Sequence, residues 1–154
     1  MRDQQLTPSL IIFSEIKRMA KLFSYVSIGS IWLSFASLIF LFFYFGVNKK
    51  KYEKIIDLYH EKGFSLYVPW HFHSLVGFFG SFTLVYYFLC LKKKKKPLLM
   101  FYKNQSVYAF FDDVPESLSG WMKAYYRVTL FALFCLLFAL MMGLMKYIYL
   151  NFSL

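Results

Sequence analysis

Apolar residues in this chain gather in three long stretches without charge, and lysine-rich segments separate them. The first stretch covers residues 22–48, the second 63–91 and the third 128–145. About 20 apolar residues in a helix cross the ~30 Å hydrocarbon core of a bilayer. Helices are expected because lipid offers no hydrogen-bonding partner to an open backbone. The pattern therefore predicts three transmembrane helices, at about 24–47, 72–91 and 128–148.

The segments between the spans complete a single polytopic membrane domain over residues 1–154. Residues 48–71 are expected to form an outer loop, and residues 92–127 a cytoplasmic loop. Within the outer loop, four apolar residues recur at i, i+3, i+4 and i+7, the stripe of an amphipathic helix. They are Tyr52, Ile55, Ile56 and Tyr59. We expect this helix to lie at the membrane surface with its tyrosines at headgroup level, or else to contact a partner protein.

The expected fold class is thus an all-α membrane protein with three transmembrane helices and a short amphipathic interfacial helix. The N-terminal tail and the second loop together carry 12 lysines and arginines, against 6 on the other side. The positive-inside rule then predicts a cytoplasmic N-terminus and a periplasmic C-terminus in a bacterial inner membrane. Because residues 1–21 are mixed in polarity and the following run is too long for a cleavable signal, the first span is expected to act as a signal anchor.

Composition supports the membrane interpretation. Hydrophobic residues make up 59% of the 154 residues, against roughly 45–50% in a typical soluble domain. This excludes a disordered chain or a coiled coil and argues against a water-soluble enzyme. A net charge of +10 would suggest nucleic acid in a soluble protein. Here the lysines flank apolar runs, so we expect anionic lipid headgroups, and no nucleic acid, as their partner.

The densest basic run follows the second predicted span and precedes Pro97. It consists of Lys92, Lys93, Lys94, Lys95 and Lys96. We interpret it as a topology signal that also attracts anionic lipid. Trp70 and Trp121 stand just before the second and third predicted spans, where interfacial tryptophan anchors are typical.

Small residues recur at steps of three and four along each predicted span, and this spacing keeps them on one helix face. In lipid, such faces let helix backbones approach closely. The expected packing residues are Ser27, Ser30, Ser34, Ser37, Gly77, Ser81, Ala139 and Gly143. Either these faces pack against each other, or one of them receives a helix of a partner protein.

Chemistry-bearing residues form no recognisable catalytic or metal pattern. No predicted span carries a charged residue near its middle, which argues against an active transporter. The histidines His60, His71 and His73 lack the spacing of a metal motif, so we expect interfacial histidines and no cofactor. We therefore expect a protein that is not an enzyme.

The LKKKKKP junction at residues 91–97, the three spans and the uncharged span interiors resemble small membrane proteins of plasmids and phages. In outline the chain is similar to the entry-exclusion protein of F-like conjugative plasmids and to immunity proteins against pore-forming colicins. The resemblance implies recognition or inhibition at the inner membrane, with a transfer-apparatus protein, a toxin or a second copy of the chain as partner. The candidate contact residues are then Tyr52, Ile55, Ile56, Tyr59, Asp112, Asp113 and Glu116.

Two other functions fit the same pattern. An accessory subunit of a larger membrane complex would suit the phenylalanine, tyrosine and lysine content, which is typical of an AT-rich organellar gene. An AT-rich gene should also encode many asparagines, and the chain contains only three, which disfavours the organellar interpretation. An oligomeric, holin-like pore former ranks last, because the third span lacks the polar face expected of a water-lined pore.

Overall fold

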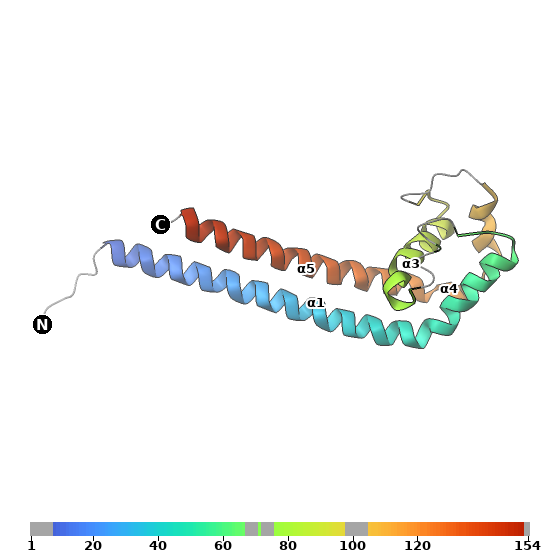
Figure 1. Cartoon of the computed structure of the whole chain (residues 1–154), viewed down its shortest axis with the longest axis horizontal. Coiled ribbons are helices and arrows are strands. Elements are labelled where there is room, and N and C mark those ends of the chain that lie inside the picture. Colours follow the sequence, from blue (N-terminus) through green and yellow to red (C-terminus); the bar gives the residue numbers. More distant parts are fainter. Residues whose placement is uncertain (1–7, 67–70, 72–75, 98–104, 153–154) are drawn as a thin grey trace, which may run out of the picture. The chain divides into compact units, whose positions relative to one another are not determined.

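The computed structural model describes residues 8–66, 71, 76–97 and 105–152. Its elements are all helical, and no strand occurs among these residues, which confirms the all-α class. In chain order they are α1 (Pro8–Glu61), α3 (Phe78–Lys92), the 3-10 helix η1 (Gln105–Asp112), α4 (Glu116–Ser119) and α5 (Trp121–Phe152) (Figure 1). The predicted outer and cytoplasmic loops are therefore helical over much of their described length.

The chain divides into two compact units, and each boundary falls inside a long helix. The helix-pair unit comprises Met1–Ser37 and Phe131–Leu154, and the core unit comprises Leu38–Leu130. Helices α1 and α5 each contribute residues to both units.

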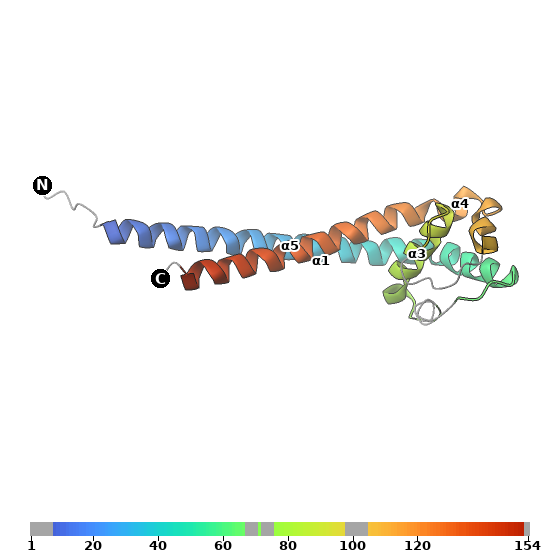
Figure 2. The same cartoon turned by 90° about the horizontal axis from the view of Figure 1, so that it is seen from above.

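In the helix-pair unit, α1 and α5 run antiparallel and side by side (Figures 1 and 2). The Ser27 hydroxyl donates a hydrogen bond to the Ala139 carbonyl oxygen over 3.0 Å, and the Ser34 hydroxyl donates to that of Ala132 over 2.9 Å. Both alanines are buried. Small residues thus allow the two backbones to approach within side-chain-to-backbone bonding distance.

The outward surface of this unit is apolar. Large side chains that stand more than half exposed include Tyr25, Trp32, Phe35, Phe134, Leu137, Leu140 and Leu144. In the most apolar 18-residue windows of the two long helices, only 11% and 22% of the residues are buried. The ranges Ser14–Glu61 and Glu116–Phe152 are both long and apolar enough to cross a membrane.

The prediction of a third span at 72–91 is wrong. Helix α3 begins only at Phe78, because the preceding Gly77 takes φ 61° and ψ −124°, a conformation that does not continue a helix. Its 15 residues rise about 22 Å, which is short of the ~30 Å hydrocarbon core. Leu84, Val85 and Phe88 of α3 are completely buried. The charge-free run therefore supplies a protein core, not a span; its residues 72–75 lie outside the described residues.

The core unit has a hydrophobic core of its own. Helices α1, α3, η1 and α5 all contribute to it, with large aromatic side chains at its centre. The ring of Tyr59 lies 5.1 Å from that of Phe110 and 5.6 Å from that of Phe88, measured between centroids. Its hydroxyl lies 2.8 Å from that of Tyr87. These contacts join α1 to α3 and η1.

The expectation of a separate amphipathic interfacial helix within the outer loop is wrong. Residues up to Glu61 continue α1 without a break. The predicted apolar stripe exists, but it faces the core unit's own core: Tyr52, Ile55 and Tyr59 are 4%, 1% and 1% exposed. Ile56 at its edge is half-buried.

Candidate functional site

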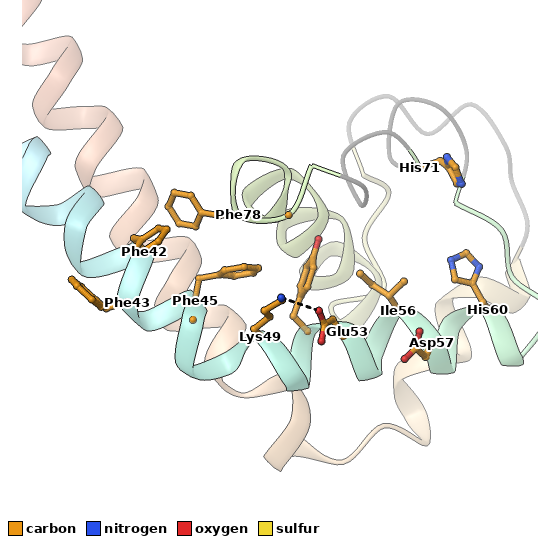
Figure 3. Close-up of a pocket in the computed structure, with 13 residues that line it drawn as sticks. Phe42, Phe43, Phe45, Lys49, Glu53, Ile56, Asp57, His60, His71 and Phe78 are labelled. Atoms are coloured by element: carbon orange, nitrogen blue, oxygen red, sulfur yellow. Dashed lines mark ion pairs between the residues drawn. The ribbon is translucent and has the colours of Figure 1, made fainter.

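A cavity of about 700 Å³ lies in the core unit, with α1 forming one long wall (Figure 3). The residues that line it are Phe42, Phe43, Phe45, Gly46, Lys49, Tyr52, Glu53, Ile56, Asp57, His60, His71, Gly77 and Phe78. Those from α1 recur mainly every three or four positions, which places them along one side of the helix. The apolar run of α1 ends just before Lys49, so the cavity has an aromatic end and a charged end.

Four phenylalanines form the aromatic end, namely Phe42, Phe43, Phe45 and Phe78. The ring centroid of Phe78 lies 5.4 Å from that of Phe42 and 5.8 Å from that of Phe45. Figure 3 shows these three side chains at the same end of the cavity. Gly46 follows in the same wall, and a Cβ built on it would meet nothing within 4 Å. The missing side chain therefore leaves open space at this point of the cavity.

The charged end contains one lysine and two carboxylates. Lys49 Nζ lies 3.6 Å from Glu53 Oε1, an ion pair drawn as a dashed line in Figure 3. Both side chains are more than half exposed, so the pair contributes little stability. Asp57, His60 and His71 extend this end of the lining. Within the described part of the chain, no group of three or more histidine, cysteine, aspartate or glutamate residues could hold a metal ion.

Tyr52 lies between the two ends of the cavity. Its ring packs against Phe45 at 5.2 Å and against Trp121 at 6.4 Å. The Tyr52 hydroxyl is buried and makes no hydrogen bond, and the same is true of the Trp121 indole N–H. A buried polar group without a partner costs about 1–3 kcal/mol. Tyr52 lines the cavity, but its hydroxyl is closed off from solvent, so the unpaired O–H is a cost to the core and not an open binding group.

The structure brings the three predicted contact acids together with lysines far away in the sequence. Lys62 Nζ lies 2.6 Å from Asp113 Oδ2, and Lys94 Nζ lies 3.1 Å from Asp112 Oδ1. Lys92 pairs with Glu116 and also donates to the Ser119 hydroxyl. The hydrogen bond from Lys62 holds the pKa of Asp113 below its usual range. Each of the three acids therefore has its own lysine partner, and two of these lysines, Lys92 and Lys94, belong to the lysine run. Lys93, Lys95 and Lys96 remain exposed.

The predicted packing serines form hydrogen bonds with different partners. Ser27 and Ser34 bond to α5, whereas the hydroxyls of Ser30 and Ser37 donate to carbonyls of their own helix. The Ser81 hydroxyl lies 2.6 Å from that of Tyr125, a contact between α3 and α5 within the core unit.

The remaining predicted packing residues are glycines and Ala139. Ala139 and Gly143 border an apolar groove of about 630 Å³ in the helix-pair unit. Gly77 precedes α3 and lines the cavity.

Of the predicted interface anchors, Trp121 is 7% exposed and packs in the core. Trp70 and His73 lie outside the described residues. Cys90 and Cys135 are free thiols. The sequence pattern did not predict the cavity. Its aromatic end forms where Phe78 packs against Phe42 and Phe45, which lie more than 30 positions before it in the sequence. The one local signal was Gly46, a residue with no side chain between an aromatic run and a charged run.

No family model, curated protein or solved structure matches this chain. The structure therefore defines only a class of protein. It is an all-α chain with two helices able to cross a membrane, which also contains a packed helical unit with a half-aromatic, half-charged cavity.

Proposed function

We propose that this chain is a two-span protein of a bacterial inner membrane that acts by contact with another membrane component and not by catalysis. The observation that carries the membrane part is the exposed apolar surface of the two long helices. The helix-pair unit exposes large apolar side chains along both helices, and on α1 this surface continues into the core unit through Phe40, Phe43 and Val47. Soluble monomers rarely expose apolar patches larger than a few hundred Å². Lipid is the solvent that suits such a surface.

Two spans in place of three change the proposed orientation. Both termini then lie on the same side of the membrane, and residues 48–127 lie on the other. That segment carries 13 of the 18 lysines and arginines. The positive-inside rule accordingly favours residues 48–127, which make up most of the core unit, in the cytoplasm and both termini in the periplasm.

Cysteine accessibility tests this topology directly. In a background with Cys90→Ala and Cys135→Ala, single cysteines replace Lys54, Ser117 or Asn151, which are all exposed. With a membrane-impermeant maleimide on spheroplasts, Lys54→Cys and Ser117→Cys should both stay unlabelled, and Asn151→Cys should be labelled. All three should react after lysis, which serves as the control. Opposite labelling of Lys54→Cys and Ser117→Cys would reject two spans.

The specific function proposed is recognition or inhibition: exclusion of redundant plasmid transfer, or immunity to a membrane-active toxin. Its support is the outline of the chain, a short membrane anchor with one compact basic unit. An accessory subunit of a larger complex is the alternative, and co-purification with a large assembly would favour it.

Plasmid transfer into recipients that express the chain tests exclusion. Donors carry the chain's own genetic element, and recipients with an empty vector give the reference frequency. A fall of several orders of magnitude is expected. Unchanged transfer into recipients whose membranes contain the protein would reject exclusion for that element, and challenge with pore-forming toxins would follow.

A further inference from the structure

We propose that the cavity of the core unit binds one phospholipid with an ethanolamine headgroup, its acyl chains at the aromatic end and its headgroup at the charged end. The inference rests on the proposed membrane location of the chain. Pockets of about 300–1,000 Å³ are typical for small-molecule ligands, and the cavity of about 700 Å³ lies in that range.

The order of residues along α1 matches the polarity profile of a lipid. Phe42 and Phe43 belong to the charge-free run and are 58% and 67% exposed, so an acyl chain can leave the cavity past their rings. Lys49 is the first charged residue after that run, where the headgroup region of a bilayer is expected. An amphiphile therefore fits the cavity in a single orientation.

The phosphate of such a lipid would meet the cation of Lys49, which lies where the aromatic lining ends. The Lys49 side chain is more than half exposed, so its ammonium group is accessible to a phosphate oxygen.

The charge of the lining selects the headgroup. Glu53 and Asp57 provide two carboxylates against the single cation of Lys49. The glycerol of phosphatidylglycerol is uncharged, so it would offer neither carboxylate a positive charge. An ethanolamine ammonium brings a positive charge and three N–H donors, whereas a choline headgroup brings the charge without any donor. Ethanolamine is therefore preferred over both.

Native mass spectrometry of the full chain tests this preference. The purified protein is reconstituted into vesicles of equal parts dioleoyl phosphatidylethanolamine, phosphatidylcholine and phosphatidylglycerol, then re-extracted in mild detergent. We expect one retained ethanolamine lipid per chain, about tenfold over either competitor, the factor that one charge-assisted hydrogen bond supplies. Equal retention of the three lipids would overturn the proposal.

Variants of α1 locate the site. Gly46→Leu places a side chain in the open space of the cavity and should abolish retention. Gly29→Leu is the matched control, because a Cβ there also meets nothing within 4 Å and the residue does not line the cavity. Lys49→Gln should weaken retention about tenfold through loss of one hydrogen bond between charged groups. Retention by Gly46→Leu at the wild-type level would overturn the assignment.

The headgroup preference has its own pair of variants. Glu53→Gln should lose the preference for ethanolamine over glycerol, whereas Lys50→Gln, an exposed residue outside the lining, should keep it. Circular dichroism checks that each variant is folded. Resistance to carbonate extraction reports membrane insertion separately. A chain that resists extraction but retains no ethanolamine lipid refutes the lipid site alone, and a chain that carbonate releases refutes the proposed function.

Discussion

The hydroxyl oxygens of Ser81 and Tyr125 lie 2.6 Å apart in the core unit, and they join α3 to α5. The Ser81 hydroxyl also donates to the carbonyl of Phe78 over 2.7 Å. Since one hydroxyl carries one proton, Tyr125 is the donor to Ser81. Both side chains are buried, so this short chain of hydrogen bonds is shielded from water.

Removal of the Ser81 hydroxyl should destabilise the core unit. Ser81→Ala leaves the buried Tyr125 hydroxyl without its acceptor, and we expect a loss of about 1–3 kcal/mol in the free energy of unfolding. Denaturant unfolding in detergent micelles measures it. Thr83→Val is the control, because the Thr83 hydroxyl bonds to the Gly80 carbonyl of its own helix. Equal losses in the two variants would contradict the proposed role of the contact.

Two serines of α1 should behave differently although they are three residues apart. Ser34 donates across to α5, whereas Ser37 donates to Leu33 in its own helix. Hydrogen bonds between membrane helices average about 0.6 kcal/mol and reach about 1.7 kcal/mol. Ser34→Ala should lower the unfolding free energy by an amount in that range, and Ser37→Ala should leave it close to the wild-type value. Unfolding by titration with sodium dodecyl sulfate compares them.

A charge on the exposed apolar surface distinguishes lipid from water around the helix pair. Leu137 is 61% exposed and lies near the middle of the apolar part of α5. In water, Leu137→Arg would change stability by less than about 0.5 kcal/mol. In a membrane it should cost about 2.5–3.5 kcal/mol and reduce the carbonate-resistant fraction. Ala124→Arg, at an exposed site in the core unit, is the control and should insert normally.

The lowered pKa of Asp113 reports on its ion pair with Lys62, which lies at the surface of the core unit. Because the hydrogen bond from Lys62 lowers the pKa of Asp113 in the folded state, the pair stabilises that state above the ordinary carboxyl pKa of about 3.9. This contribution is lost as the pH falls through the lowered pKa. Lys62→Gln should raise the pKa of Asp113 towards its ordinary value, as a carbon-13 NMR titration would show. Lys54→Gln should leave it unchanged.

The length of the charge-free runs correctly predicted two long helices, but it did not give the correct number of candidate spans. The run at 63–91 has the length of a span, and its hydrophobicity suits a buried helix equally well. Two properties distinguish a buried helix from a span here. The positive φ of Gly77 prevents α3 from beginning before Phe78, and other elements bury Leu84 and Phe88. Neither property can be seen in a hydropathy pattern.

Periodicity likewise identified faces and not their surroundings. Tyr52, Ile55 and Tyr59 do share one side of α1, as their spacing predicted, yet that side faces α3 and η1 instead of a membrane surface. Ser27 and Ser34 show the same limit, since their spacing also fits Ser30, which bonds within its own helix. The lysine partners of Asp112 and Asp113 could not be predicted from the sequence, because no local pattern connects residues 18 or 51 positions apart.

The hydrophobic core of the core unit is completed by residues of α5, which the ribosome synthesises late. The ring of Phe45 lies 6.1 Å from that of Tyr125, and Tyr52 packs against Trp121, so each contact joins the first long helix to the last. While the intervening residues are being translated, the faces of Phe45 and Tyr52 have no cover from α5. A nascent chain of this protein must therefore carry an unfinished core until the start of α5 emerges from the ribosome, and the core depends on that helix for its completion.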